Sequence, residues 1–391
     1  MNTANIETHV QPTHDERARQ QFVSSFRKNA IFDMRQRMRT DYEDRVLPAL
    51  LKDGRREPQR WQDVQAAMEA EASYRFYSSM RYNAQEMCYL SVQRPIERAL
   101  PAMIDAARQI AKLNKLGGSL RLNPDLEVPN YVTALDVHLA PGCFHREYTA
   151  DDVAQGAVVS FGGKVFTGQH PFRKRAGVVA ESVSQWVRHK WPDFAPRRIL
   201  DLGTTSAKNL LPYHATFPSA ELYGIDVGAP VLRFGYALAE QEGVAVHLSQ
   251  QNAEQTDFAD GRFDLIVSSF FFHELPMKVT KKILRECRRL LAPGGVMAHM
   301  ELPNEAAASA YDNFFWNWDT ANNNEPFYTK FREQNPLQLC SEAGFLSDAC
   351  FAQTIPDYAS FGEERFVQFV RGEIAAPQHG LGGWFVFGAR G

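Results

Sequence analysis

The pattern of apolar and polar positions between residues 198 and 301 switches repeatedly between short apolar runs and longer amphipathic stretches. Short β-rich runs bounded by glycine or polar residues are typical of buried strands, whereas apolar positions three or four residues apart are typical of helices. Their alternation predicts a parallel sheet covered by helices on both faces. The expected elements are 198–202, 207–216, 221–225, 229–242, 244–249, 263–268, 277–291 and 295–301, then a helix over 336–343 and strands over 349–354 and 383–389.

The first third of the chain has a mainly helical pattern. Residues 1–16 are mostly polar, and we expect them to be disordered. Residues 17–117 are predicted to form a helical cap or dimerisation domain. Its last helix is expected to begin at Pro95 or Pro101, because proline is well tolerated in a first helical turn.

Residues 118–172 have a different character, because glycine and proline are frequent and β-rich pieces alternate with turns. The runs 131–138 and 157–161 are typical of strands. We therefore expect a connecting segment with a small β-hairpin. A helix is predicted to follow from Arg175 to Lys190.

Composition and charge argue against a nucleic-acid-binding protein and against a membrane-spanning protein. A chain of 391 residues with 44% hydrophobic and 23% charged residues is an ordinary globular chain with room for two domains. Its net charge of −3 provides no general attraction for nucleic acid, and the best basic cluster, Arg173-Lys174-Arg175, is read as a solvated linker. No apolar run approaches 18 residues, so no membrane span is expected.

The cysteines and other metal-binding residue types do not form a recognisable metal motif. The five cysteines lack CxxC spacing, which argues against a zinc knuckle or a disulfide framework and fits a reducing cytoplasm. No His, Asp or Glu spacing argues for a metal, and no signal peptide is visible in residues 1–16. We expect a soluble cytoplasmic protein without nucleic-acid or membrane partners.

Two neighbouring predicted strands each end in an acidic residue. The run Arg198-Ile-Leu-Asp201-Leu-Gly203 passes from a strand into a glycine turn, and the run 221–226 ends in Asp226. Open α/β sheets bind ligands at the carboxyl ends of adjacent parallel strands, and an acid after the second strand can accept both ribose hydroxyls. An aspartate there can also cap the following helix. Dinucleotide enzymes use the same arrangement, so the two acids alone do not name the cofactor.

Further motifs follow in order: Asn252-Ala253-Glu254, the strand 263–267, the segment from Ser268 to Pro276 that contains Phe-His-Glu-Leu-Pro, and the helix-to-strand turn 288–296. With the two acidic strand ends, this order resembles the class I S-adenosylmethionine-dependent methyltransferases of the small-molecule type, over roughly residues 170–391, with the methyltransferase domain itself expected over 173–391. The resemblance implies a Rossmann-like, seven-stranded, doubly wound sheet with an antiparallel last strand. One departure is the family's Gly-x-Gly-x-Gly loop, which here keeps only Gly203.

The resemblance also implies a set of cofactor contacts. Asp226 would bind the ribose, and Asp201 would orient the glycine loop or bind the methionyl ammonium through water. Asn252 would contact adenine, although an asparagine at this position can also cap its own loop. The implied S-adenosylmethionine-binding residues are Asp201, Gly203, Thr204, Thr205, Asp226, Val227, Asn252, Ala253, Glu254 and Ser268.

Two residues after the later strands are candidates for catalysis. Methyl transfer requires alignment of the reacting atoms and removal of a proton when the acceptor carries one. A histidine that is neutral near pH 7 suits proton removal, so His273 is the candidate base; the His273–Glu274 pair could equally anchor the next helix. Glu301 is a second candidate base or substrate anchor, or a buried cap of its turn. His138 and His145 lie in a turn-forming segment from which one could reach the pocket.

An aromatic insert, residues 304–335, interrupts the sheet pattern. Phe315, Trp316 and Trp318 alternate with amide and acidic residues, as in the walls of a pocket for a small organic molecule. Tyr82 in the helical region is a further candidate. The alternative is a lid that packs on the N-terminal helices.

These observations together predict a methyltransferase that acts on a small aromatic or amphiphilic molecule, most simply on oxygen, and that forms a homodimer by analogy with similar enzymes. Two other functions stay open: a same-fold enzyme that uses S-adenosylmethionine without consuming it, for a pericyclic or cyclisation step, and a non-catalytic regulatory protein that binds the cofactor. The Asn-Pro-Pro-Tyr motif of amino-group methyltransferases is absent after the fourth strand.

Overall fold

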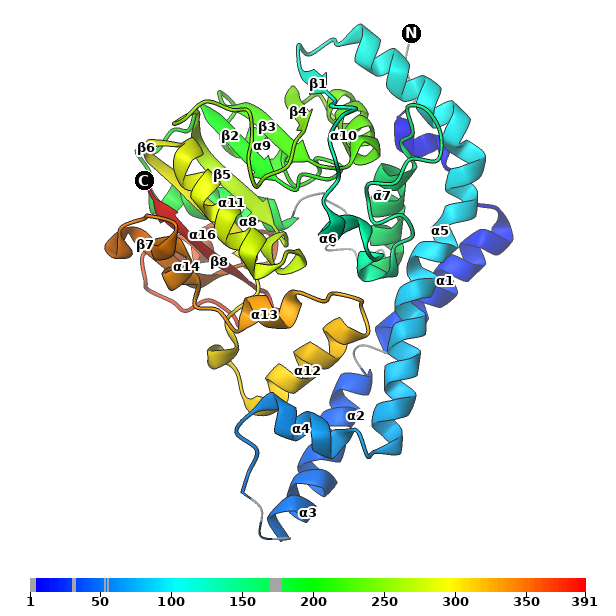
Figure 1. The fold of residues 1–391 in the computed structure, drawn as a ribbon, viewed down its shortest axis with the longest axis vertical. Helices are drawn as coiled ribbons and strands as arrows, with labels where there is room; N and C mark the ends of the chain where they lie inside the picture. Colours follow the sequence, from blue (N-terminus) through cyan, green and yellow to red (C-terminus); the bar gives the residue numbers. More distant parts are fainter. Residues whose placement is uncertain (1–4, 30–32, 53, 55, 169–177) are drawn as a thin grey trace.

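A mixed eight-stranded sheet forms the centre of the protein, in the order β1-β4-β3-β2-β5-β6-β8-β7 (Figure 1). The computed structural model describes residues 5–29, 33–52, 54, 56–168 and 178–391. β8 runs antiparallel to its neighbours β6 and β7, whereas the strands from β1 to β6 pair in parallel. The strands are β1 (Ser119–Arg121), β2 (Arg198–Leu202), β3 (Glu221–Asp226), β4 (Val246–Gln250), β5 (Phe263–Ser269), β6 (Leu291–Glu301), β7 (Cys350–Pro356) and β8 (Gly383–Arg390).

The doubly wound sheet with an antiparallel last strand is thus confirmed, and the expected count of seven strands is wrong by one. The additional strand is β1, which pairs with β4 at the edge of the sheet. Its three residues are too few to carry the period-two alternation by which strands are recognised in a sequence.

Helices cover both faces of the sheet because successive strand residues point to opposite sides. On one face, Ile199 and Leu265 belong to a core with Trp186 of α8. On the other, Leu200 and Ile266 pack in a core with Ile283 of α11. The helices of this region are α8 (Val178–Lys190), α9 (Leu211–Thr216), α10 (Ala229–Gln241), η6 (Phe272–Glu274), α11 (Met277–Leu290), α14 (Pro336–Glu342), η8 (Ser347–Ala349), α15 (Tyr358–Phe361) and α16 (Glu363–Val370).

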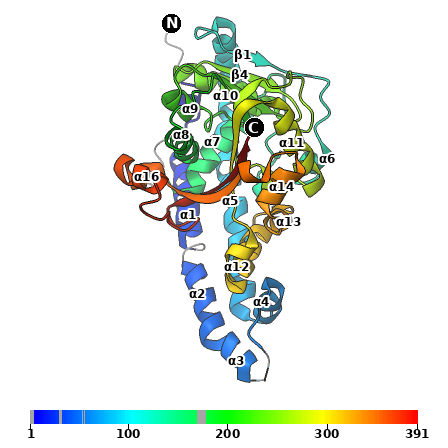
Figure 2. The same ribbon diagram turned by 90° about the vertical axis from the view of Figure 1, so that its left-hand side faces the viewer.

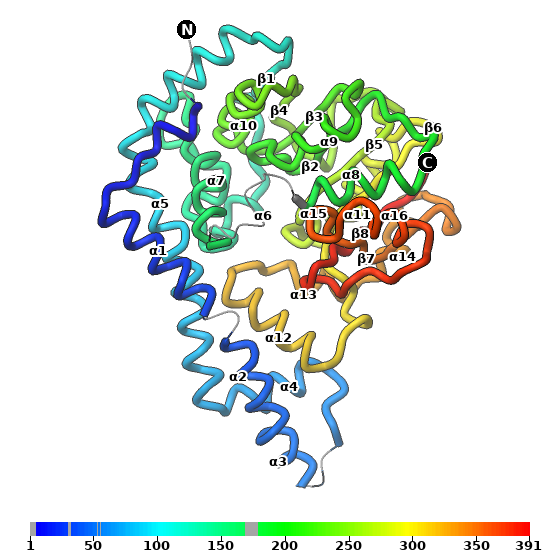
Figure 3. The backbone as a smooth tube through the Cα atoms, turned by 180° about the vertical axis from the view of Figure 1, so that it is seen from behind, coloured from blue at the N-terminus to red at the C-terminus, as the bar shows by residue number. Residues whose placement is uncertain are grey.

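The N-terminal region is helical, and α1 runs alongside the long helix α5 (Figure 3). The helices α2 to α4 form a narrow lower extension, where α4 packs against α12 of the aromatic insert (Figures 1 and 2). The elements of these parts are η1 (Ile6–His9), α1 (His14–Lys28), α2 (Met34–Asp41), η3 (Tyr42–Val46), α3 (Leu47–Lys52), α4 (Trp61–Met68), α5 (Ala72–Leu113), η7 (Glu305–Ala307), α12 (Ala310–Ala321) and α13 (Tyr328–Arg332).

Helix α5 continues through both Pro95 and Pro101, so the helix start expected at one of them is wrong. A proline inside a helix removes one backbone donor and usually bends the helix. Here a row of buried residues, Val92, Ile96 and Met103 among them, packs the middle of α5 in one core with α1 and α7. The buried face stabilises the helix enough to offset the missing donors.

The prediction that residues 1–16 are disordered is wrong for residues 5–16. Ile6 is fully buried, and its backbone nitrogen donates to the Gln241 side chain at 2.8 Å. Glu7 forms ion pairs with Lys164 and Lys208, each at 2.9 Å. Helix α1 then begins at His14. One buried aliphatic residue and one ion-pair centre order a segment that is polar overall, which composition alone does not reveal.

The hairpin predicted within 118–172 is also wrong. The run 131–138 lies in α6 (Asn130–Thr133) and η4 (Val137–Leu139), and the run 157–161 lies inside α7 (Ala154–Phe166). Helix α7 is buried between α5 and α10, and a short apolar run of this kind does not distinguish a buried helix from a buried strand. A Cβ atom on Gly162 would lie 2.6 Å from the Tyr89 ring. That glycine therefore permits close helix packing and does not mark a turn.

The expected basic linker and the absence of a membrane span can be compared with the described residues only in part. The basic cluster 173–175 and the expected helix start at Arg175 lie outside the described residues, within which α8 begins at Val178. Within the described ranges, no helix combines the length and the apolar character needed to cross a membrane.

Candidate active site

The loop after β2 requires a glycine at its first position. Gly203 has a φ of +65°, a left-handed conformation, and a Cβ atom there would lie 2.5 Å from the ring of Phe271. The backbone nitrogen of Thr204 donates to Ile225 O at 3.0 Å, which fixes the loop to the end of β3. Thr205 follows with a φ of +47°. The single retained glycine is therefore the position where a side chain cannot be accommodated.

Asp226 connects this loop to the start of α10. Its Oδ2 accepts a hydrogen bond from Thr205 N at 3.0 Å, and its Oδ1 accepts one from Gly228 N at 2.8 Å. Burial raises the pKa of Asp226, and the backbone donors oppose that rise. A carboxylate oxygen can accept a second hydrogen bond. The structural contacts and the predicted ribose contact are therefore compatible.

Asp201 lies beneath the same loop and is almost fully buried. Burial raises the pKa of its carboxyl group to about 7, partly opposed by the nearby Thr204 hydroxyl. Among the described residues, its Oδ2 has no hydrogen-bond partner. A buried carboxylate oxygen without a partner is costly unless a ligand or water satisfies it.

The predicted adenine-side residues follow β4. Asn252 Oδ1 accepts a hydrogen bond from Glu254 N at 2.9 Å, which is the loop-capping geometry. The Glu254 carboxylate accepts hydrogen bonds from Tyr131 Oη at 3.0 Å and Lys282 Nζ at 2.8 Å. Asn252 also lines a cavity of about 330 Å³, together with Asn123 and Gln251. Ala253 is buried in the core beneath this loop.

The remaining predicted cofactor residues, Val227 and Ser268, contact side chains of the neighbouring strands β4 and β6. The carbonyl oxygen of Val227 accepts a hydrogen bond from Gln250 Nε2 at 3.0 Å. Ser268 Oγ lies 2.9 Å from Nδ1 of His299, and both side chains are buried. Burial lowers the pKa of His299 to about 3, so this imidazole is neutral. Sequence reasoning missed His299, which sits inside an apolar strand with no motif around it.

His273 in η6 and Glu301 at the end of β6 form a buried pair. Nδ1 of His273 lies 2.6 Å from Oε2 of Glu301. The other oxygen, Oε1, accepts a hydrogen bond from Phe272 N at 2.6 Å, and Oε2 also accepts one from Leu302 N at 3.3 Å. The structure thus brings together the two predicted catalytic residues, and the same contacts anchor η6 to β6.

The charge of His273 differs from expectation. Burial favours the neutral ring, but the Glu301 and Glu274 carboxylates outweigh it and raise the pKa of His273 well above its usual value. The ring is therefore protonated at neutral pH in the ligand-free protein. The role of His273 as a base, which requires the neutral ring, stays a prediction; the sequence did not indicate the raised pKa because the Glu301 carboxylate comes from a distant strand.

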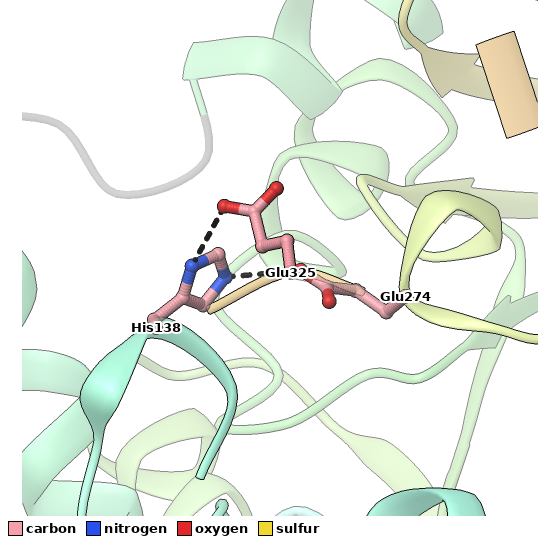
Figure 4. A group of neighbouring side chains, drawn as sticks. All are labelled: His138, Glu274 and Glu325. Atoms are coloured by element: carbon pink, nitrogen blue, oxygen red, sulfur yellow. Dashed lines mark ion pairs between the residues drawn. The ribbon is translucent and has the colours of Figure 1, made fainter. Parts of the chain in front are cut away.

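A second histidine reaches the same region. Nε2 of His138 lies 3.0 Å from Oε1 of Glu274, and its Nδ1 lies 3.1 Å from Oε1 of Glu325, as Figure 4 shows. Glu325 was not predicted as a site residue, and no local pattern marks it. His145, the other histidine considered, contacts the carbonyl of Cys143 in its own turn at 3.1 Å.

Two of the predicted aromatic wall residues pack against the N-terminal helices. Phe315 and Trp318 are buried in a cluster with Tyr42 and Met68, which is the alternative weighed for the insert. Trp316 is partly buried against the same cluster, with its ring centre 4.2 Å from the Arg332 guanidinium, whereas Tyr82 is exposed on α5. Their role as substrate contacts stays a prediction.

Comparison with known proteins adds to this geometry. Residues 199–295 match a family model described as a methyltransferase domain. The chain is 36% identical over 109 residues to demethylmenaquinone methyltransferase of Thermus thermophilus, covering 28% of this chain and 49% of that protein. It is 33% identical over 121 residues to malonyl-[acyl-carrier protein] O-methyltransferase of Methylococcus capsulatus, covering 31% and 42%. The chain thus spans about half or less of the curated relatives it matches.

A solved structure from Nostoc punctiforme, described as a candidate O-methyltransferase, aligns with 79% of this chain and 72% of its own. The TM-score is 0.44 and the sequence identity is 16%.

The strand order and the matched segment define a class I methyltransferase fold. Residues 199–295 belong to the S-adenosylmethionine-dependent methyltransferase domain family, and an N-terminal helical region precedes them in the same chain.

Proposed function

We propose that this protein transfers the methyl group of S-adenosylmethionine to an oxygen atom of a small aromatic or amphiphilic molecule. The observation that carries the proposal is a convergence at the carboxyl edge of the parallel strands. The Gly203 loop and Asp226 lie at the ends of β2 and β3, and the His273–Glu301 pair lies beyond β5 and at the end of β6.

The residues present fit this cofactor. No side chain can occupy position 203, so the backbone of the loop stays open to close approach by a ligand. Asp201 offers a buried carboxylate oxygen that has no hydrogen-bond partner in the described part of the chain, and such an oxygen suits a cationic group. The loop after β4 adds Asn252 beside a cavity.

The mechanism requires little covalent chemistry from the protein. Bound S-adenosylmethionine supplies an activated methyl group on a positively charged sulfur. Asp226 and the Gly203 loop hold the donor side, so that the acceptor needs only to be aligned with it. His273 receives the acceptor's proton after first losing its own, and Glu301 holds the ring in place through Nδ1.

The acceptor is not specified by the matched segment. The names of the two curated relatives indicate different acceptors, demethylmenaquinone and a malonyl group on a carrier protein. We propose that the N-terminal helices and the insert 304–335 cover the cleft and select the acceptor, and that the helical region also forms a homodimer. Size-exclusion chromatography with light scattering tests the dimer.

One assay decides between the proposed function and its two rivals. The protein is incubated with S-adenosylmethionine and a panel of hydroxylated aromatic compounds, and products are identified by mass spectrometry. S-adenosylhomocysteine with a methylated acceptor supports the proposal. A rearranged acceptor with unchanged cofactor supports the pericyclic or cyclisation function, and binding without any product supports a regulatory role.

Replacing Asp226 by alanine is expected to weaken cofactor binding by about 1–3 kcal/mol, or roughly 5- to 150-fold, because charge-assisted hydrogen bonds are lost. Isothermal titration calorimetry with S-adenosylhomocysteine measures the change. Asp264→Ala is the matched control. Asp264 also accepts two backbone hydrogen bonds, from Arg197 and Arg198 at 2.9 Å, but it lies where β5 begins and not at the carboxyl ends of the strands. Equal affinity of wild type and Asp226→Ala would contradict the ribose assignment.

Replacing Asp201 by asparagine is expected to remove a pH dependence from binding of S-adenosylmethionine. The pKa of Asp201 is raised to about 7 by burial, and a cationic ligand group binds only the ionised form. Affinity of the wild type should therefore fall about tenfold per pH unit below pH 7, whereas the variant should bind more weakly at a constant level. Calorimetry between about pH 5.5 and 8.5 measures both; a flat wild-type profile would contradict this expectation.

The same variant gives an independent stability test. Asp201 has a higher pKa folded than unfolded, so the folded state binds the proton more tightly and loses stability as the pH rises from about 4 to 7. Asp201→Asn should therefore raise the Tm of the ligand-free protein at pH 8 and change it least at pH 4.

A further inference from the structure

Five titratable side chains form a continuous line from the sheet to the loop after α12. Oε2 of Glu301 lies 2.6 Å from Nδ1 of His273, whose Nε2 lies 3.4 Å from Oε1 of Glu274. The same Oε1 lies 3.0 Å from Nε2 of His138, whose Nδ1 lies 3.1 Å from Glu325. One carboxylate oxygen, Oε1 of Glu274, is therefore shared by two imidazole rings.

His138 is the most exposed member of the line. The exposed fraction of the side chain rises from 0% for Glu301 to 5% for His273, 19% for Glu274 and 27% for His138, and it falls to 6% for Glu325. Among these residues, His138 is the one through which protons exchange most readily with water. The two histidines are thus an inner and an outer member of one array.

Glu274 depends on these two rings. Both of its oxygens are buried and neither makes a hydrogen bond to a described residue, so its contacts with the two rings are ion pairs at 3.0 and 3.4 Å. Burial opposes its ionisation, but His138 and His273 outweigh that effect and hold the pKa of Glu274 below its usual value. A change at either ring therefore reaches the other ring through this carboxylate.

A shared proton fits the outer group better than a shared metal ion. The ligand atoms of His138, Glu274 and Glu325 lie within 4.8 Å of one another, close enough for one ion to be considered. Figure 4 shows, however, that the two carboxylates face opposite nitrogens of the ring. An ion bonds only one ring nitrogen, whereas a doubly protonated ring forms an ion pair with a carboxylate at each nitrogen. Nδ1 of His138 also lies 2.9 Å from the side-chain nitrogen of Asn323.

We infer that His138 is a positioning residue that governs the proton on His273 through the shared carboxylate of Glu274. The inference rests on the proposed function, in which His273 takes the acceptor's proton. The resting His273 is already protonated, so that proton must leave before the ring can act as a base. His138, doubly protonated at rest, first releases a proton to water, and Glu274 then passes the proton of His273 to it.

In one turnover, the line of side chains takes up one proton and releases one proton. The acceptor's new O–C bond forms as the S–C bond breaks, and the acceptor hydroxyl gives up one proton. That proton enters at Nε2 of His273, whose 3.4 Å contact with Glu274 is the longest in the line. One proton leaves from His138 to water, so the array regains its starting charge.

The other titratable groups packed against His273 do not carry charge at neutral pH. Tyr328 of α13 lies edge-on to the ring, with 5.6 Å between ring centres, and burial raises its pKa. His379, which precedes β8, has its pKa lowered to about 4 by burial and by the nearby cations Arg332 and His273. Glu301 and Glu274 are therefore the charges that set the protonation of His273.

The groups around His138 behave in the same way. Cys88 and Tyr89 from α5 and Cys143 from its own turn are close enough to interact with the ring electrostatically, and burial raises the pKa of each. All three are uncharged at neutral pH. Glu274 and Glu325 remain as the charged partners of His138.

The test is nitrogen-15 NMR of histidine side chains in the full-length protein, titrated from about pH 5 to 10. Glu274→Gln should lower the titration midpoint of His273 by about one pH unit or more, because an adjacent anion is lost. His138→Asn should raise that midpoint, because the Glu274 carboxylate then pairs with His273 alone. Asparagine suits position 138, where φ is +58° and few residues are tolerated.

Two controls distinguish electrostatic coupling between His138 and His273 from a purely structural role of these side chains. His299 is fully buried outside the line, and its signal should stay that of a neutral ring in every variant. Glu325→Gln removes an anion beside His138 and so favours loss of the His138 proton without changing residue 138. It should also raise the titration midpoint of His273. This variant replaces His138→Asn if His138→Asn fails to fold. A His273 midpoint identical in all three variants would overturn the inference, even if their Tm values fall.

The outcome is distinguishable from failure of the proposed function. Absence of S-adenosylhomocysteine formation by the wild type with every acceptor would contradict methyl transfer, but it would not alter the NMR midpoints. Methyl transfer with an unshifted His273 midpoint would retain the proposed function and remove the role of His138.

Discussion

Replacing His273 by glutamine is expected to slow methyl transfer about 10²- to 10⁴-fold, the usual contribution of a positioned general base. Binding of S-adenosylhomocysteine should change little, since the ring pairs with Glu301 and Glu274. The pKa of His273 is raised, so the active, neutral ring becomes more abundant as the pH rises. The wild-type rate should therefore increase from pH 7 upward, and the variant should lose that dependence. Product formation followed by mass spectrometry measures both.

A stability control accompanies this variant. Removing the cation from a buried pair leaves the Glu301 carboxylate uncompensated, at a cost of about 3–5 kcal/mol in the free energy of unfolding. The double variant His273→Gln/Glu301→Gln should recover much of that stability but not the rate. If the single variant is fully active, His273 serves only to anchor η6 to β6.

Replacing Gly203 by alanine is expected to abolish measurable cofactor binding and to destabilise the fold. The left-handed backbone alone costs about 1–3 kcal/mol for a residue with a Cβ atom, and that atom would also lie 2.5 Å from the Phe271 ring. Either the loop or the ring must shift, and both adjoin the proposed donor site. Calorimetry with S-adenosylhomocysteine and chemical denaturation measure the two effects.

Gly243→Ala is the matched control for that substitution. Gly243 also has a positive φ, +78°, but nothing lies within 4 Å of the Cβ atom it would gain. This variant should show the cost of backbone strain alone and full cofactor affinity. If Gly203→Ala behaves in the same way, the collision with Phe271 is not what the loop avoids.

The centre of the fold was predictable because its signals are local. Each parallel strand is a short apolar run between polar or glycine residues, so the strands β2 to β6 appear in the chain as separate units. The errors occurred where packing outweighs local pattern. Helix α7 is apolar on several sides because α5 and α10 both cover it, and Gly162 admits the Tyr89 ring. A sequence does not record which neighbour will bury a short apolar run.

The candidate site divides in the same way. Gly203 and Asp226 were predictable because adjacent parallel strands place their carboxyl ends together. The ligand roles given to these residues stay predictions. The charge of His273 was not predictable, since it depends on Glu301 at the end of another strand. Likewise, nothing near Glu325 in the sequence indicates that it meets His138.

The ion pair between Glu7 and Lys208 connects the first described segment to the region after β2. Glu7 neutralises Lys208, which directly follows the glycine loop, and that lysine is largely buried. Although burial opposes ionisation, Lys208 and Lys164 lower the pKa of Glu7 to about 2, so the pairing persists in mild acid. A Glu7→Gln variant leaves the Lys208 cation without this ion-pair partner beside the Gly203 loop. A residue far from the loop in the sequence thus contributes to the charge balance around it.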